Sequence, residues 1–511
     1  MEPMSGAALR ALTAKARRGH GGAGLGSLVG DAYTYLLTAV VAVAMAVSGA
    51  GVLGAELDTT TPEASAGVAW LWWVGSLAAL GLLLGLLARL GPVGVGAPGA
   101  LWWLTTPADR PGLLRPVLAG WLAATGVIGA VIGAAVAALV GAPLGTVGVA
   151  ALGGAGAGVA LAAAAALSQV LPGNHAIRGR RLALVGDLLT AFAVIAWIAL
   201  TETGTIPPAT PAVATAAALV ILGVVLAVAA AARLGGISGI DLRERGARTG
   251  RASFAIVSLD LRELGRVLTD TGRDSRRRLA RLGGVRGPVT AMVAADWLLL
   301  TRSPRQLAML ATSLGIPFAM EVAGGSLPLV LGGLVVGAYL AATAVGVGAR
   351  AAEDAPALDR ALGMSARATR AARLVLPSAV LLVWVLVTIV LRDSLGSGAV
   401  IGAATTGLGV TLIVWLPMAV LLAIGLAAAA VKAAYRKPPD WGGQLVVAPG
   451  GIAYPPGVIT SLTLGPVLNL VATLPALVAF AVGPQPVLLL AQLIVSGILV
   501  AVAAHVGSLK K

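Results

Sequence analysis

Cysteine is absent from this 511-residue chain, and histidine, aromatic residues and charged residues are scarce. Without cysteine, disulfides, thiolate catalysis and Cys-based metal sites are excluded. The three histidines are well separated, so no imidazole metal cluster is expected. Charged residues make up 11% of the chain and hydrophobic residues 58%, whereas soluble domains contain about 25% charged residues. A soluble fold could not bury so much apolar surface, and the composition therefore indicates a membrane protein.

Motifs for catalysis are also missing. None of the lysines follows a GxxxxG sequence, so the chain has no P-loop with which to bind and hydrolyse ATP. Neither GxSxG, nor a pair of catalytic carboxylates, nor a histidine relay is recognisable. The sequence GGAGAG at residues 153–158 lies within an apolar run, and we interpret it as a helix-packing surface rather than a nucleotide loop. We therefore expect no enzymatic activity and no cofactor in this chain.

Apolar runs of about 20 residues, the length an α-helix needs to cross the hydrocarbon core, lie on both sides of a basic central segment. We predict an all-α polytopic membrane protein with twelve transmembrane helices. The predicted spans are residues 33–53, 66–88, 117–140, 144–170, 182–200, 212–232, 307–322, 327–347, 374–391, 400–430, 458–482 and 487–506. The predicted organisation is a first six-span half (1–232), a cytoplasmic basic linker (233–305) and a second six-span half (306–511).

Two stretches outside the spans are amphipathic. Basic residues between Arg10 and Arg18 alternate with apolar ones, which favours a short helix on the inner membrane surface, with a cleaved signal peptide as the alternative. In the linker, apolar residues from Phe254 to Leu268 recur at spacings of three and four, which predicts an amphipathic helix. The basic run at 273–282 should contact water or anionic lipid. We expect no nucleic acid as partner, because no folded domain or aromatic residues accompany the charge.

Charge indicates the orientation. If both termini are cytoplasmic, all of the 36 Lys and Arg residues except Arg392 lie on the cytoplasmic side. Such a bias is the positive-inside pattern of a multi-pass protein, and it supports the twelve-span count as well as this orientation. We expect the protein in the cell membrane, with both termini in the cytoplasm. The acidic residues on or near the outer side are Glu56, Asp58, Glu63, Glu202, Glu321 and Asp393.

The two halves share their irregularities. In each, an amphipathic stretch precedes the first span and a long connection follows the second span. A constant offset places Leu101 on Leu358, Arg110 on Arg367 and Leu118 on Val375. This correspondence predicts two pseudo-repeats of the same topology, related by an axis along the membrane normal.

The long connections contain the first candidate site. In the first, apolar residues lie beside polar ones between Pro98 and Pro107, which indicates either an interfacial helix on the headgroups or a docking element for a cytoplasmic partner. The candidate docking residues are Leu101, Trp102, Trp103, Asp109, Arg110 and Arg115 in the first connection, and Leu358, Asp359, Arg360, Arg367 and Arg370 in the second.

Polar residues inside the spans are the second candidate set. Asp187 lies less than two turns inside a span, where it is either functional or a hydrated or Arg-paired carboxylate. Thr405, Thr406, Asn469 and Gln492 are either substrate-pathway residues or helix–helix hydrogen-bonding groups.

Together these features resemble the permease of an ABC exporter of the type V kind. The phrase WLTTPADRPGLLRP at 103–116 resembles the loop after the second span in twelve-span permease-like proteins of actinobacteria, and AADWLLLTRSPRQLAML at 294–310 resembles their segment entering a permease half. The resemblance implies that this loop is a coupling helix, and that two separate ATPase subunits, or one ATPase homodimer, carry the ATP and Mg²⁺. They would dock on residues 101–115 and 358–373 and drive export of a hydrophobic or amphipathic substrate.

Two alternatives stay open. The sequence Asp109-Arg110-Pro111-Gly112 resembles the DRxGRR-like motif of major-facilitator secondary transporters, and Asp359 with Arg360 echoes it. Against that family, the connection is long, the second basic pair of the motif is absent and buried coupling carboxylates are scarce. The third class is a membrane scaffold without transport activity.

Overall fold

The computed structural model describes residues 5–19, 45, 48–55, 62–171, 175–203, 213–257, 261–269, 285–322, 326–395, 408–436, 444, 446–447, 453–455 and 457–505. These residues are almost entirely helical, apart from turns and one short hairpin that pairs β1 (Val446–Val447) with β2 (Ala453–Tyr454). The chain forms two compact units. Unit 1 comprises residues 1–257 and 262–273, and unit 2 comprises residues 258–261 and 274–511.

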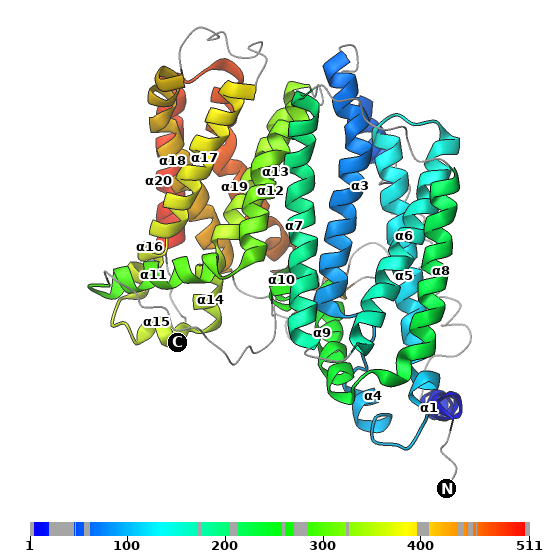
Figure 1. The fold of residues 1–511 in the computed structure, drawn as a ribbon. Coiled ribbons are helices and arrows are strands. Elements are labelled where there is room, and N and C mark those ends of the chain that lie inside the picture. Colours follow the sequence, from blue (N-terminus) through cyan, green and yellow to red (C-terminus); the bar gives the residue numbers. More distant parts are fainter. Residues whose placement is uncertain are drawn as a thin grey trace. The chain divides into compact units, whose positions relative to one another are not determined.

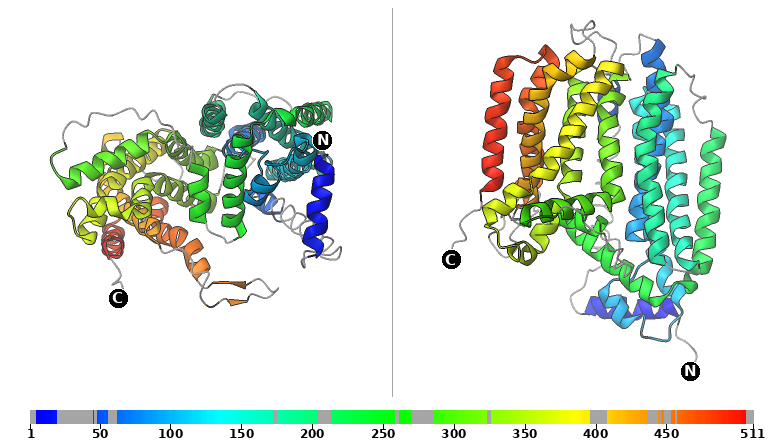
Figure 2. Two further views of the ribbon diagram at one scale, coloured as in Figure 1. Left: turned by 90° about the horizontal axis from the view of Figure 1, so that it is seen from below. Right: turned by 60° about the vertical axis from the view of Figure 1, so that its left-hand side comes forward.

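Unit 1 is a bundle of long helices with shorter helices at one end (Figure 1). Helix α5 packs on α6, α6 packs on α8, and α3 pairs with α7. The short helices α1 and α4 and the polar helix α9 lie at the end of the bundle where α3 ends and α5 begins (Figures 1 and 2). The elements are α1 (Gly6–Gly19), α3 (Pro62–Leu90), α4 (Ala97–Trp102), α5 (Arg110–Leu139), α6 (Leu144–Val170), α7 (His175–Glu202), α8 (Val213–Arg233), the 3₁₀ turn η1 (Leu234–Gly236), α9 (Gly239–Val257) and α10 (Leu261–Thr269).

Unit 2 has the same general form. Helix α12 packs on α13, α17 on α18, and α18 also contacts α19 and α20, while α13 contacts α19. Helix α11 lies across one end of this bundle (Figure 1). The elements are α11 (Pro288–Thr301), α12 (Pro304–Val322), α13 (Leu327–Val345), α14 (Val347–Asp354), α15 (Pro356–Arg360), α16 (Ala366–Ala372), α17 (Val375–Leu395), α18 (Leu408–Ala434), α19 (Gly457–Val482) and α20 (Pro486–Ala504).

Ten helices among the described residues are long and apolar enough to cross a membrane, and they coincide with ten of the predicted spans. Helix α12 covers the predicted span 307–322 but is not one of the ten, since Arg305, Gln306 and Glu321 near its ends lower its mean hydropathy. The predicted span 33–53 lies largely outside the described residues. The chain is thus an all-helical polytopic membrane protein, and its twelve-span count stays a prediction.

Small residues bring the helices of unit 1 close together. Gly129 and Gly133 of α5 face Gly154 and Ala150 of α6, and a Cβ atom added to Gly129 would collide with the Gly154 carbonyl oxygen. The spacing of four puts small residues on one face of each helix. Lipid tails are as apolar as the side chains, so helices in a membrane associate through close van der Waals contact, which small residues permit. This confirms the packing interpretation of GGAGAG.

Replacement of Gly129 by alanine should therefore separate α5 from α6. We expect the free energy of unfolding to fall by about 1–3 kcal/mol, the usual cost of overpacking. The measurement is thermal unfolding in detergent, followed by tryptophan fluorescence. Gly120→Ala is the matched control in the same helix, because an added Cβ there meets nothing within 4 Å. Equal unfolding midpoints for the two variants would contradict the close contact.

Candidate functional site

The connection between α3 and α5 is held against α9. It begins at Gly91, whose φ of 75° lies in the left-handed region that favours glycine. Val93 and Val95 are then buried, with exposed fractions of 0% and 3%. The Val95 amide donates a hydrogen bond to the carbonyl of Leu242 in α9, at 2.9 Å. The connection is therefore packed on its own unit rather than extended into solvent.

Helix α4, within this connection, presents apolar side chains outwards. Its first turn contains Pro98, and Leu101 and Trp102 near its end are 71% and 73% exposed. Trp103 instead packs against the buried cluster that contains Val93, Val95 and Leu242. Exposed large apolar groups on an otherwise anchored element are typical of a contact surface for a partner or for membrane headgroups.

Asp109 joins α1 to the start of α5. Its carboxylate caps α5 by accepting a hydrogen bond from the Gly112 amide at 2.7 Å, and it also accepts one from the Gly6 amide of α1. The hydrogen bond from Gly6, followed by that from Gly112, lowers the pKa of Asp109. The next residue, Arg110, donates to the carbonyl of Ile237 at 3.2 Å. Both residues therefore bind other parts of unit 1 although, like Arg115, they are exposed.

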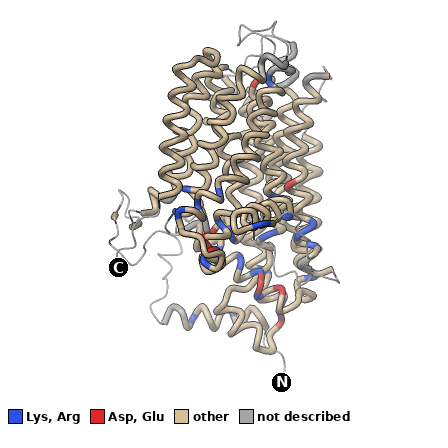
Figure 3. Tube along the Cα trace, turned by 90° about the vertical axis from the view of Figure 1, so that its left-hand side faces the viewer, with Lys and Arg blue, Asp and Glu red and all other residues tan. Residues whose placement is uncertain are grey.

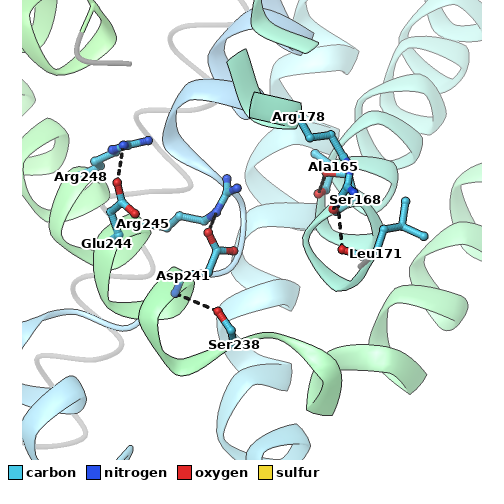
Figure 4. A network of polar contacts seen from close by, with 9 residues as sticks. All are labelled: Ala165, Ser168, Leu171, Arg178, Ser238, Asp241, Glu244, Arg245 and Arg248. Atoms are coloured by element: carbon cyan, nitrogen blue, oxygen red, sulfur yellow. Dashed lines mark hydrogen bonds and ion pairs between the residues drawn. The ribbon is translucent and has the colours of Figure 1, made fainter. Parts of the chain in front are cut away.

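A buried ion pair in α9 lies against the start of the connection (Figure 4). The sequence analysis did not predict this pair. Arg245 Nε donates to Asp241 Oδ1 at 2.8 Å, and both side chains are 9% exposed. The Arg245 guanidinium lies against Gly91, where any Cβ would collide with it. The i, i+4 spacing of Asp241 and Arg245 could have predicted an ion pair on this helix.

Arg178, in the first turn of α7, caps the C-terminus of α6. Its guanidinium donates to the carbonyls of Ser168 and Leu171, at 2.8 and 3.0 Å (Figure 4). The Ser168 hydroxyl donates to the carbonyl of Ala165 at 2.6 Å. Carbonyls at the C-terminus of α6, which have no partner within the helix, are thus satisfied by a cation.

In unit 2 the connection between α13 and α17 is built around Arg373. Its guanidinium contacts Asp296 of α11 at 2.5 Å and Asp359 of α15 at 2.6 Å, and it donates to the carbonyl of Gly348 at 3.2 Å. The Arg373 and Asp296 side chains are 7% and 5% exposed. Burial raises the pKa of Asp296, and the positive charge of Arg373 opposes that effect. Asp359 therefore faces inwards rather than towards a partner.

Arg370 is also engaged within unit 2. It donates to the carbonyl of His505, and its guanidinium lies over the Tyr435 ring, 4.7 Å from the centroid. Arg360 and Arg367 are exposed. The side chain of the remaining candidate, Leu358, lies outside the described residues. Of the second set of docking candidates, Arg360 and Arg367 are thus the ones the structure leaves accessible.

The polar residues within the spans make contacts between helices. Asp187 forms an ion pair with Arg89, which favours the Arg-paired interpretation. Asn469 Nδ2 donates to the carbonyl of Val335 at 3.2 Å, and Gln492 Nε2 donates to the carbonyl of Ala472 at 3.0 Å. These contacts favour a helix-packing role for both amides. The predicted pathway residues Thr405 and Thr406 lie outside the described residues. In the described part of the chain, no group of three His, Asp or Glu side chains could hold a metal ion.

The geometry defines a class of protein: a polytopic helical membrane protein with an anchored connection at one end of each bundle. Within that class, the chain belongs to the DUF6297 family, a family of unknown function whose match covers residues 61–444 and both connections. No curated protein and no solved structure matches the chain.

If Asp109 fastens α1, then Asp109→Ala should release that helix. A fluorophore on Leu12→Cys, the sole thiol in an otherwise cysteine-free chain, should lose anisotropy at neutral pH in this variant. Because the native pKa is lowered, the attachment persists above the ordinary value of about 4 and is lost as pH falls through the native pKa. The parent chain should therefore release α1 only in acid. Thr105→Ala, which removes an exposed hydroxyl bonded locally to Leu101, is the control. Unchanged anisotropy in Asp109→Ala would exclude the attachment.

Arg373→Gln should strongly destabilise unit 2. It leaves the buried carboxylate of Asp296 without its cation, and breaking a buried ion pair in this way costs about 3–5 kcal/mol. Thermal unfolding in detergent measures the loss. Arg367→Gln removes the same charge from an exposed position in α16, the short helix that Arg373 follows, and should change the midpoint little. Similar midpoints for the two variants would show that the ion pairs contribute no net stability.

Proposed function

We propose that this chain is the permease subunit of an ATP-driven exporter in the cell membrane, with both termini in the cytoplasm. Separate ATPase subunits would dock on the two connections, residues 101–115 and 358–373, and drive a hydrophobic or amphipathic substrate across. The observation that carries the proposal is the first connection, whose buried side is fastened to the bundle while Leu101 and Trp102 face outwards. ATP and Mg²⁺ would belong to the partner.

The order of elements supports two like-oriented halves. A short helix (α1 or α11) comes first, and a helix pair follows the long connection in each unit. In unit 1 the packed pairs are α5 with α6, α6 with α8 and α3 with α7. Their counterparts in unit 2 are α17 with α18, α18 with α20 and α13 with α19, and unit 2 in addition packs α12 on α13 and α19 on both α18 and α20. The three shared pairs correspond in chain order, as expected of two pseudo-repeats.

A docking surface can drive transport only if its displacement is passed to the spans. Contacts that would pass it on are present in the first connection, because Val95 is bonded to Leu242 of α9, Arg110 to Ile237 just after η1, and Asp109 to α1. A push on α4 would therefore be transmitted to the ends of α3 and α5 rather than absorbed by a loose loop. In the second connection, Arg373 joins α11, α14 and α15 in the same way.

The contacts of Asp109 and Arg110 weaken the alternative of a major-facilitator secondary transporter. Their resemblance to that family's motif is the main argument for it, yet here Asp109 caps a helix and holds α1. The pairing of Asp187 with Arg89 likewise leaves no free carboxylate at that position for proton coupling.

The energy source that drives transport distinguishes the ATP-driven exporter from a secondary transporter and from a scaffold. Inside-out membrane vesicles that contain the chain and its native membrane partners should accumulate a lipophilic fluorescent dye on addition of ATP, with the proton gradient collapsed by an ionophore. Accumulation driven by a proton gradient without ATP would favour the secondary transporter, and no accumulation under either condition would favour a scaffold.

The docking surface is tested by the double substitution Leu101→Ser and Trp102→Ser. We expect ATP-dependent accumulation to fall roughly tenfold or more, because truncation of a central aromatic anchor commonly costs at least 2 kcal/mol of binding energy. Ile240→Ser is the matched control, since Ile240 is 79% exposed in α9 of the same unit but lies outside the connection. Unimpaired transport in the double variant would rule out docking at α4.

A further inference from the structure

Five cations gather around the end of α18 in unit 2. Arg305 lies in the first turn of α12, Arg350 in α14 and Arg370 in α16, while Lys432 and Arg436 lie at the end of α18 and just beyond it. All five side chains are partly buried. Figure 3 shows how Lys and Arg concentrate towards one end of the helices. We call these five residues the α18 cation cluster.

The members of the α18 cation cluster are close enough for their charges to interact. Burial, followed by the charges of Arg305 and Arg436, lowers the pKa of Arg350 to about 10. The charges of Arg370 and Lys432 repel one another. The Arg370 guanidinium also lies over the ring of Tyr435, the residue that precedes Arg436. Helix α14 packs against α18, and α16 packs against α20. Four separate elements thus bring positive charge to one place.

Among the described residues at this end of unit 2, cations outnumber carboxylates. The described cations there are Arg286, Arg302, Arg305, Arg350, Arg360, Arg367, Arg370, Arg373, Lys432 and Arg436, and the described carboxylates are Asp296, Glu353, Asp354 and Asp359. Asp296 and Asp359 are both bound to Arg373, and Asp354 attracts Arg350, so the described cations remain in excess. The C-terminus of α18 adds only about half of one negative charge.

Partly buried like charges repel one another more strongly than exposed ones, because water screens them less. A surplus of this kind is stabilised by an anion that reaches several of the cations at once. Arginine is suited to phosphate in particular, since its planar fork donates two parallel hydrogen bonds to phosphate oxygens.

We propose that the α18 cation cluster binds the phosphate of an anionic phospholipid headgroup. The cluster lies where α13 ends at Val345 and α18 ends at Ala434, the level at which spans leave the hydrocarbon and headgroup phosphates lie. Leu307, two residues from Arg305, is 43% exposed and apolar, as contact with an acyl chain requires. The site is independent of the transport proposal and would hold for a scaffold as well.

The test uses the purified full chain, incubated with vesicles of equal parts phosphatidylglycerol and phosphatidylcholine and then analysed by native mass spectrometry for retained lipid. The parent chain should retain phosphatidylglycerol preferentially. The double substitution Arg350→Gln and Arg436→Gln should reduce that retention roughly tenfold or more. Arg360→Gln with Arg367→Gln removes the same charge from exposed positions at the same end of unit 2 and should leave the preference intact.

Three outcomes would overturn the proposal: no lipid preference in the parent chain, retention in the Arg350/Arg436 variant, or an equal loss in the Arg360/Arg367 control. A further arm adds inorganic phosphate. If the free anion abolishes phosphatidylglycerol retention at the concentration at which it raises the unfolding midpoint, the ligand of the α18 cation cluster is soluble phosphate and not lipid. Unfolding midpoints in phosphatidylcholine establish that each variant is folded. If the double substitution fails to fold, the single substitution Arg350→Lys takes its place. Arg350→Lys removes the planar guanidinium but keeps the positive charge, and this variant should retain less phosphatidylglycerol.

Discussion

Hydrocarbon does not solvate charge or unpaired backbone groups, and this constraint determines most of the structure. It requires that the spans be helical, so that every backbone hydrogen bond is made within the segment. It also requires that ionisable groups leave the spans or find partners inside them. Arg89 and Asp187 neutralise one another, and Arg392, 9% exposed, lies over the Phe480 ring with its guanidinium 4.6 Å from the centroid. The remaining charged side chains lie near the helix ends, in the connections and the short helices.

The two units satisfy the same constraint with different side chains. Unit 1 relies on close backbone contact through glycine, as at Gly129 and Gly154. The core of unit 2 contains larger groups: Trp415 packs against Phe480 with ring centroids 5.1 Å apart, and Trp384 donates a hydrogen bond to Ser313 at 2.9 Å. Similar helix pairings are therefore kept in unit 2 with aromatic contacts added to a core that still contains many buried alanines.

Hydropathy predicts the helices well because burial in lipid depends on local composition. The predicted span 144–170 has the same bounds as α6, and 458–482 differs from α19 by one residue. The docking candidates were harder to predict, because a sequence shows which residues share a helix face but not which distant element covers it. Asp359 and Arg370 look like surface residues, yet Arg373 and the His505 carbonyl engage them. Asp296, 77 positions from Arg373, could not be paired with it by spacing alone.

The attachment of α1 has a consequence for biosynthesis. The Gly6 amide precedes its acceptor, Asp109, by 103 positions in the chain. A ribosome must therefore translate the whole of α3 and α4 before the carboxylate that receives α1 exists. Until then α1 is a basic helix without this attachment, and the attachment can form only after the first turn of α5 has been translated.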